Sequence, residues 1–135
     1  MSDISKGRGY VYSLQYHVVW CVKYRHEVLT GRVDEFLCSI LHKIASDNGF
    51  KITEINTDKD HVYILLDCKP QHYIPDMIKA LKGVSGRALM KEFGDELKTK
   101  LWGGHIWSPS YFIATVSENT EAQVRAYIQN QKQGR

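Results

Sequence analysis

The order of the predicted strands and helices constrains the fold of this chain more than any other feature of its sequence. Aromatic and β-branched residues predict a first strand over Val11–Val22. Apolar residues at helical spacing predict a helix over Val33–Ala45, which Asn48-Gly49 should end because glycine tolerates the left-handed conformation there. Two further strands are predicted at Lys51–Asn56 and His61–Asp67, with a polar turn between them.

The second half of the chain continues this alternation. Pro75 suits the first turn of a helix that Gly94 should end, Tyr111–Val116 predicts a fourth strand, and a last helix follows over about Glu121–Lys132. The first six elements match an α/β (α+β) ferredoxin-like plan, a split βαβ antiparallel sheet with helices on one face. The last helix is an addition to that plan.

The length of 135 residues fits one domain. We expect a single domain over residues 1–135, with a loose N-terminal arm over residues 1–9. The N-terminus lacks the apolar stretch of a secretory signal, and no run approaches the roughly 18 apolar residues of a membrane span. Cys21, Cys38 and Cys68 match neither a disulfide framework nor a zinc site, which favours buried thiols in a reducing compartment. The sequence therefore predicts a cytoplasmic protein with no membrane contact.

Charge is distributed unevenly along the chain. Residues 33–68 are acidic, whereas residues 1–32, 69–100 and 120–135 carry more Lys and Arg than Asp and Glu. If the basic blocks share a face, that face suits a polyanion. Ordinary solvated charge is the alternative interpretation.

Two pairs of residues are candidates for chemistry. Strand alternation puts His61 and Tyr63 on the face opposite to the core side chains of their strand. Helical spacing puts Tyr127 and Gln131 on one face of the last helix. Each pair also has a purely structural interpretation: polar side chains on an exposed sheet face, and a tyrosine at the edge of an apolar helix stripe.

Several short segments together resemble the single-tyrosine HUH transposases of insertion sequences, the TnpA family. The resemblance extends from about Gly9 to Gln131, nearly the whole chain, and the order and spacing of the segments are highly specific although each alone is weak. The segments are Tyr16-His17-Val18-Val19-Trp20-Cys21-Val22-Lys23-Tyr24-Arg25, Asp58-Lys59-Asp60-His61-Val62, Lys79-Ala80-Leu81-Lys82-Gly83-Val84-Ser85-Gly86-Arg87, Leu101-Trp102, Thr115-Val116 and Tyr127-Ile128-Gln129-Asn130-Gln131.

The resemblance implies a DNA transposase that cleaves and rejoins single-stranded DNA at insertion-sequence ends beside a hairpin. Tyr127 would be the nucleophile, on a catalytic helix over residues 120–132, forming a 5′-phosphotyrosine and leaving a free 3′ hydroxyl. His61 and Gln131 would bind a divalent metal ion, Mg²⁺ or Mn²⁺. A tyrosine with a pKa of about 10 is a poor nucleophile, and a metal that polarises the phosphate compensates for this.

The chain departs from the family pattern at Tyr63, where the resemblance implies a second histidine ligand. A phenol must lose a proton of pKa about 10 to bind a metal well, so the metal site should be weakened. Three interpretations stay open. Activity persists at reduced metal affinity, with water in place of the missing ligand. A neighbour, Asp60 or His105, substitutes. Or the chain is a catalytically impaired relative that still dimerises and binds hairpin or single-stranded DNA.

Contacts to DNA are predicted from the end of the first strand and from the second long helix. These residues are Lys23, Tyr24, Arg25, Lys79, Lys82 and Arg87. Phosphate contacts by such residues would make binding depend strongly on salt. Trp102, His105 and Trp107 are candidates for stacking on unpaired bases, with core burial as the alternative for the two tryptophans.

The resemblance also implies a homodimer in which the tyrosine helix of one subunit completes the active site of the other. The apolar strand over Tyr16–Val22 suits pairing with a second copy across a two-fold axis. Two other classes stay open for comparison: a non-catalytic DNA-binding module, and a ferredoxin-like domain that binds single-stranded RNA.

Overall fold

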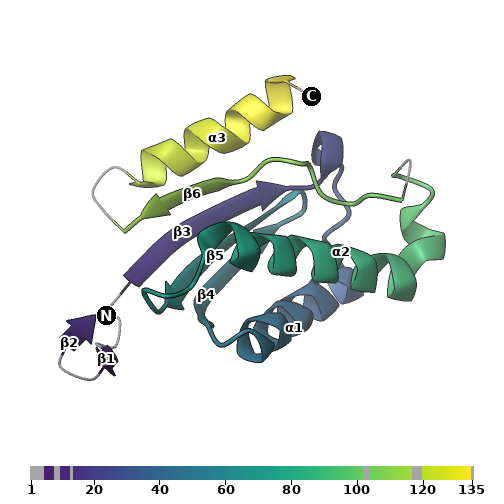
Figure 1. The fold of residues 1–135 in the computed structure, drawn as a ribbon. Helices are drawn as coiled ribbons and strands as arrows, with labels where there is room; N and C mark the ends of the chain where they lie inside the picture. Colours follow the sequence, from purple (N-terminus) through teal and green to yellow (C-terminus); the bar gives the residue numbers. More distant parts are fainter. Residues whose placement is uncertain (1–4, 8–9, 13, 102–103, 117–119, 135) are drawn as a thin grey trace.

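The computed structural model describes residues 5–7, 10–12, 14–101, 104–116 and 120–134 (Figure 1). Along the chain the elements are β1 (Ser5–Gly7), β2 (Tyr10–Tyr12), β3 (Leu14–Cys21), the 3₁₀ turn η1 (Lys23–Arg25), α1 (Gly31–Asp47), β4 (Lys51–Asp58), β5 (His61–Cys68), α2 (Ile74–Leu97), β6 (Phe112–Thr115) and α3 (Thr120–Gly134).

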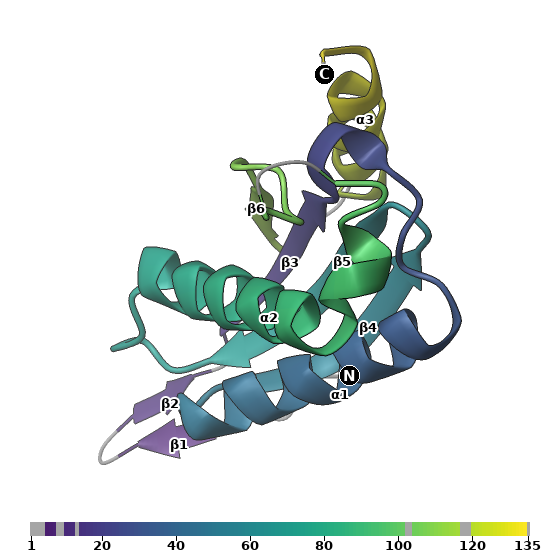
Figure 2. The same ribbon diagram turned by 90° about the vertical axis from the view of Figure 1, so that its right-hand side faces the viewer.

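Four antiparallel strands form the central sheet in the order β4-β5-β3-β6. Helices α1 and α2 lie together against one face of this sheet, and α3 lies on the other side, along β6 and β3 (Figures 1 and 2). This arrangement confirms the predicted ferredoxin-like sheet with two covering helices and one added C-terminal helix.

The hydrophobic core fills the space between the sheet and the two covering helices. Burial alternates along β5 as the sequence predicts: Val62, Ile64 and Leu66 are buried, while His61 and Tyr63 on the other face are half-buried. On the helical side, buried residues recur every three or four positions, which is the spacing of one helix face. They are Val33, Leu37, Leu41, Ile44 and Ala45 in α1, and Met77, Ile78, Leu81, Ser85, Leu89, Phe93 and Leu97 in α2.

The second face of the sheet is also covered where α3 crosses it. Val19 and Cys21 of β3 have no exposed surface, although they point away from α1 and α2. Since α3 contacts β3, η1 and β6, this helix provides the cover. The buried part of the second face therefore lies directly under the helix that carries Tyr127.

Several predicted boundaries differ from the structure. Residues Ser5–Gly7 of the predicted loose arm form β1, which pairs with β2 in a short hairpin separate from the main sheet. Helix α2 does not end at Gly94 but bends at Phe93 (φ −123°, ψ 21°) and continues to Leu97, because both apolar residues remain buried in the core. The end of α1 is as predicted: Asn48 caps it, and Gly49 follows at φ +79°.

The expectation that Tyr16–Val22 pairs with a second copy of the chain is wrong. Strand β3 is hydrogen-bonded to β5 on one side and to β6 on the other, so it has no free edge in this sheet. The apolar character of the segment reflects burial on both faces, which long central strands show without any partner molecule.

The three cysteines are free thiols, but only two of them are buried as expected. Cys21 and Cys68 lie in the interior, whereas Cys38 of α1 is half-buried. Among the described residues, no helix is both long enough and apolar enough to cross a membrane.

Candidate active site

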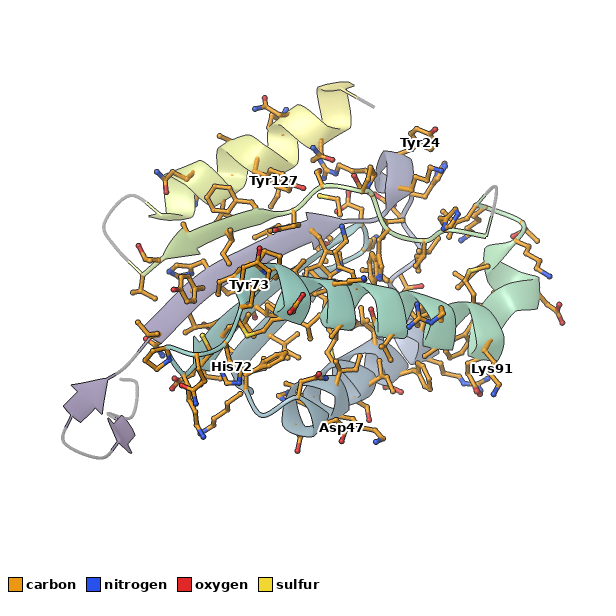
Figure 3. The ribbon with its side chains drawn as sticks, viewed as in Figure 1. Tyr24, Asp47, His72, Tyr73, Lys91 and Tyr127 are labelled. Carbon is orange, nitrogen blue, oxygen red and sulfur yellow. The ribbon has the colours of Figure 1, made fainter. Side chains whose placement is uncertain are left out.

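Tyr127 lies on the side of α3 that faces the sheet edge (Figure 3). Its hydroxyl shares a hydrogen bond of 2.9 Å with the Ser110 hydroxyl, and its ring lies 5.9 Å from that of Phe112. One helical turn further on, the Gln131 side-chain oxygen accepts a 3.1 Å hydrogen bond from the Ser108 hydroxyl. The segment that leads into β6 therefore holds both predicted site residues of α3.

His61 is oriented from behind by a carboxylate. Its Nδ1 lies 2.8 Å from the Asp60 side-chain oxygen, and its side chain is only 17% exposed. A carboxylate on Nδ1 fixes the tautomer and leaves Nε2 as the nitrogen that can bind a metal. The other Asp60 oxygen accepts a 2.8 Å hydrogen bond from Nε of Arg25 and forms an ion pair with Nη2 at 2.7 Å. Both Asp60 oxygens thus have partners, which favours an orienting role over direct ligation.

A strained turn brings Arg25 to this position. Tyr24 and Arg25 have φ values of 56° and 54°, a left-handed conformation that residues with side chains adopt at a cost. The turn directs the guanidinium back onto Asp60 and onto α3, where Nη1 donates a 3.1 Å hydrogen bond to the carbonyl of Ile128. Arg25 therefore joins the histidine side of the site to the tyrosine helix.

Cys21 connects the two halves of the site. It is the cross-strand partner of His61, and its carbonyl accepts a 2.9 Å hydrogen bond from the Ser108 amide. Since Ser108 also holds Gln131, the metal ligands predicted on β5 and on α3 lie in one neighbourhood. Burial raises the pKa of the Cys21 thiol to about 11, so this residue stays neutral and does not compete as a nucleophile.

Tyr63 is engaged with a residue that the resemblance did not assign. Its hydroxyl lies 2.5 Å from Nδ1 of His17 on the neighbouring strand. Burial raises the pKa of Tyr63 and lowers the pKa of His17. Both shifts favour the uncharged forms, so the phenol keeps its proton and is engaged in a hydrogen bond with a neutral imidazole.

The Tyr127 hydroxyl is also protonated in this arrangement. Burial raises its pKa, and the hydrogen bond from Ser110 offsets this only in part. A protonated phenol is a weak nucleophile, so any attack on phosphate requires that the proton leave and that the phosphate be polarised.

The six predicted DNA contacts differ in how available they are. Lys79 and Arg87 are exposed on α2, and Tyr24 is 56% exposed with the ammonium of Lys23 5.6 Å from its ring centre. In contrast, Arg25 is engaged with Asp60 and Ile128, and Lys82 donates to two backbone carbonyls. Arg25 and Lys82 are therefore the least available of the six for a phosphate.

A hollow of about 540 Å³ lies between α2 and the segment from Gly104 to Pro109. Lys82, Arg87 and His105 contribute its polar lining. Trp107 contributes to the wall but is 8% exposed, packs edge-to-face on Trp20 and donates to the Ser85 hydroxyl at 3.1 Å. Core burial is thus the correct interpretation of Trp107, and Trp102 lies outside the described residues.

Sequence reasoning missed the residues that hold the site together. Nothing in the sequence marks Ser108 or Ser110, and Arg25 is predicted only as a DNA contact. No periodicity or motif marks a serine whose partner is some 20 residues away on another element. For Arg25 a signal existed, since Asp60 precedes the candidate histidine and a buried carboxylate requires a cation or hydrogen bonds.

Known proteins resemble this chain over nearly its full length. A family model described as transposase, IS200 like, matches residues 10–131. The ISDra2 transposase TnpA of Deinococcus radiodurans is 53% identical over 129 residues, which are 96% of this chain and 91% of that protein. The transposase for insertion sequence element IS200 of Salmonella typhimurium is 32% identical over 120 residues, 89% of this chain and 78% of that protein.

Solved structures agree with these sequence matches. The crystal structure of a Deinococcus radiodurans chain assigned as a transposase has a TM-score of 0.88 at 50% identity, covering 94% of this chain and 97% of that one. A REP-associated tyrosine transposase bound to a REP hairpin has a TM-score of 0.58 at 16% identity, covering 96% and 74%, and supports the fold alone. The match of the family model and the two curated relatives together show that the chain belongs to the IS200-like transposase family.

Proposed function

We propose that this transposase cleaves and rejoins single-stranded DNA at insertion-sequence ends next to hairpins, through a 5′-phosphotyrosine on Tyr127. One observation supports this most: Tyr127, Gln131 and His61 come from α3 and β5, yet contacts through Ser110, Ser108 and Cys21 connect them on one face of the sheet. A purely structural tyrosine on an amphipathic helix would not require that neighbourhood.

The proposed cleavage exchanges one phosphodiester for another. The Tyr127 oxygen attacks the phosphorus while its proton passes to solvent, and the bond from phosphorus to the 3′ oxygen breaks. That oxygen takes up a proton and leaves as the 3′ hydroxyl, while the 5′ phosphate stays on Tyr127. Attack by the 3′ hydroxyl of another end reverses the step, and no nucleotide cofactor is needed because the bond energy is retained.

A divalent ion fits the donor atoms on this face. His61 Nε2 and the Gln131 side-chain oxygen would hold it, with water and a DNA phosphate completing the shell, as is common for Mg²⁺. Among the described residues, no cluster of three or more His, Cys, Asp or Glu is present, so the site would depend on the DNA. When bound, Mg²⁺ or Mn²⁺ supplies Lewis-acid polarisation of the phosphate. Tyr63 is not assigned as a ligand, because its phenol is protonated and bound to His17.

DNA would be bound by basic and aromatic side chains of α2 and η1 that are at least partly exposed. Lys79 and Arg87 on α2, together with Lys23 and Tyr24 on η1, are proposed as contacts to phosphates and unpaired bases. A hairpin next to the cleavage site is proposed because the chain belongs to the IS200-like transposase family.

A homodimer is proposed because exchange of two DNA ends needs two tyrosines, and each chain carries one on α3. Within a single chain, α3 is packed on its own sheet, so one subunit can assemble the site alone in this state. Sedimentation equilibrium would test the assembly: a mass of about twice 15.6 kDa supports the dimer, and a mass of one chain contradicts it.

The experiment for the proposed chemistry follows the fate of the 3′ side of the cleaved strand. Hairpin-bearing single-stranded DNA labelled at its 3′ end is incubated with protein and Mg²⁺ or Mn²⁺, then run on a denaturing gel. We expect label at the mobility of a protein–DNA adduct with the native chain, and none with Tyr127→Phe, which keeps the ring beside Phe112 but lacks the nucleophilic oxygen. Tyr73→Phe, a change at a 66% exposed tyrosine, is the matched control and should leave the adduct unchanged.

The second candidate, a catalytically impaired relative that binds hairpin DNA, is favoured by one observation, the presence of Tyr63 where a second histidine ligand is expected. Binding without an adduct in any metal would support this candidate and contradict cleavage. Preference for RNA over DNA of the same sequence would contradict both.

A further inference from the structure

Lys82 lies in the middle of α2, and its side chain is half-buried, whereas a lysine on a covering helix is usually exposed. It donates hydrogen bonds to the carbonyl of Ser108 at 2.6 Å and to the carbonyl of Ser110 at 2.9 Å. Its third neighbour is the ring of Tyr111, 5.9 Å from the ammonium. Lys82 thus contacts Ser108, Ser110 and Tyr111, which flank Pro109 in the segment that leads from the core to β6.

The two serines that Lys82 binds through their carbonyls use their hydroxyls for the active site. Ser108 donates to the Gln131 side-chain oxygen, and Ser110 shares a hydrogen bond with the Tyr127 hydroxyl. One ammonium therefore fixes the backbone of both residues that contact the proposed metal ligand and the proposed nucleophile. Because serine has a single rotatable bond between backbone and hydroxyl, a fixed backbone limits where each hydroxyl can lie.

We propose that Lys82 is a positioning residue, which fastens the Ser108–Ser110 segment to α2 so that its two serine hydroxyls hold Tyr127 and Gln131 in place for cleavage. This inference rests on the proposed function of Tyr127. It assigns Lys82 a role inside the chain in place of the DNA contact that its charge and helix position suggest.

The burial of this amine supports the assignment. Burial lowers the pKa of Lys82 to about 8, and an electrostatic interaction with the nearby Cys21 opposes part of this decrease. An ammonium that loses hydration is costly unless hydrogen bonds replace the water, and here two carbonyls do so at short distance. A lysine that served only to bind phosphate would gain nothing from this position.

Three variants test the proposal. Lys82→Met keeps the length and the apolar stem of the side chain but cannot donate, and Lys82→Arg restores a cation with donors. Lys91→Met is the matched control, because Lys91 is exposed on the same helix at its far end and contacts none of these residues (Figure 3).

The first measurement needs no DNA. Hydrogen–deuterium exchange of the free protein is compared for peptides from α3 and β6. We expect Lys82→Met to speed exchange in α3 by about tenfold or more, as loss of charge-assisted hydrogen bonds implies, with Lys82→Arg between Lys82→Met and the native chain and Lys91→Met unchanged. Exchange in α3 that is identical in Lys82→Met and the native chain would overturn the proposal, whether or not the chain cleaves DNA.

The second measurement separates positioning from DNA binding. With saturating hairpin DNA, single-turnover adduct formation by Lys82→Met should be about tenfold slower or more, while the Kd for DNA and its salt dependence change by less than about twofold. Weaker binding with a shallower salt dependence and an unchanged rate at saturation would overturn the proposal and make Lys82 a phosphate contact. If the native chain forms no adduct, the proposed function of Tyr127 fails. The exchange measurement would still show whether Lys82 fastens the Ser108–Ser110 segment to α2.

A variant that does not fold would not leave the question open. Ser110→Ala keeps the carbonyl that Lys82 binds and removes only the hydroxyl that contacts Tyr127. It should slow adduct formation without speeding exchange in the 104–110 segment, whereas an unchanged rate of adduct formation in Ser110→Ala would overturn the proposal.

Discussion

The ion pair between Arg25 and Asp60 should stabilise the fold far more than an ordinary surface pair. The two side chains are 17% and 11% exposed and are joined by a 2.8 Å hydrogen bond and an ion-pair contact of 2.7 Å, and the other Asp60 oxygen is hydrogen-bonded to His61. The chain also offers a matched surface pair, Lys43 with Asp47, whose side chains are 67% and 60% exposed at 3.0 Å. Both pairs join one cation to one aspartate, but the first is buried and held through two nitrogens, whereas the second is an exposed single contact within one helix.

The magnitude follows from burial and geometry. Removing one member of a buried pair leaves the other charge uncompensated and costs on the order of 3 kcal/mol, whereas exposed pairs contribute about 0–1 kcal/mol. With an unfolding entropy of about 2.1 cal/mol/K per residue, a loss of 3 kcal/mol in a chain of this length lowers Tm by roughly 10 °C. Asp60→Asn and Arg25→Met should each show a decrease of this size, while Asp47→Asn and Lys43→Met should shift Tm by less than about 3 °C.

A double-mutant cycle measured by urea unfolding provides the assay. For Arg25→Met with Asp60→Asn we expect a coupling energy of about 2 kcal/mol, because most of the cost of each single change is the unpaired partner. The cycle for Lys43→Met with Asp47→Asn should give less than about 0.5 kcal/mol. Equal coupling energies for the two pairs would refute the reasoning that Arg25 joins β5 to α3 through a desolvated contact.

The pair of Arg25 and Asp60 also determines how the stability of the fold changes as the pH falls. Burial alone would raise the pKa of Asp60, but the hydrogen bonds from His61 and Arg25 and the Arg25 charge outweigh it, and the pKa lies below its usual value. A carboxylate with a lower pKa in the folded state stabilises the fold above its unfolded pKa of about 3.9. That contribution is lost as the pH falls through the folded pKa, so the stability difference between the native chain and Asp60→Asn should shrink below about pH 4.

Three further predictions concern the metal, the thiols and the DNA contacts. Tyr63→His should raise metal affinity and adduct formation together, because a neutral imidazole binds divalent ions better than a protonated phenol; calorimetric titration of Mn²⁺ checks this, and no change in either would contradict the assignment of the site. Iodoacetamide at pH 8 should modify half-buried Cys38 before Cys21, because burial raises the pKa of the Cys21 thiol to about 11. Peptide mass spectrometry over time measures the order of modification, and earlier modification of Cys21 would contradict this prediction. Arg87→Met and Lys79→Met should each weaken hairpin binding and reduce the slope of log K against log salt concentration by about 1. An unchanged slope for either variant would show that the residue does not contact a phosphate.

The architecture could be predicted from sequence because local patterns determine it. Alternation in His61–Asp67 identified which side chains face the helices, and the spacing of apolar residues located α1 and α2. The order of the elements then left few topologies with an antiparallel sheet. The error at Gly94 has a tertiary cause, since the burial of Phe93 and Leu97 keeps the helix going past a residue that favours termination.

The site was less predictable than the fold. The resemblance supplied Tyr127, Gln131 and His61, and the structure places them in one neighbourhood. It could not supply Ser108 and Ser110, since their importance arises from contacts to α3 and Lys82 that no local pattern encodes. Positive charge was also misleading, because sequence alone does not distinguish a cation that faces solvent from one whose donors are used inside the protein.

The residue that becomes covalently bonded to the DNA decides whether Tyr127 is the nucleophile. The protein–DNA adduct formed with hairpin-bearing single-stranded DNA would be digested with nuclease and protease, and the modified peptide would be sequenced by mass spectrometry. The account predicts a phosphonucleotide on Tyr127, within the α3 peptide that also contains Gln131. Modification of Tyr63 or of any other tyrosine in its place would contradict it.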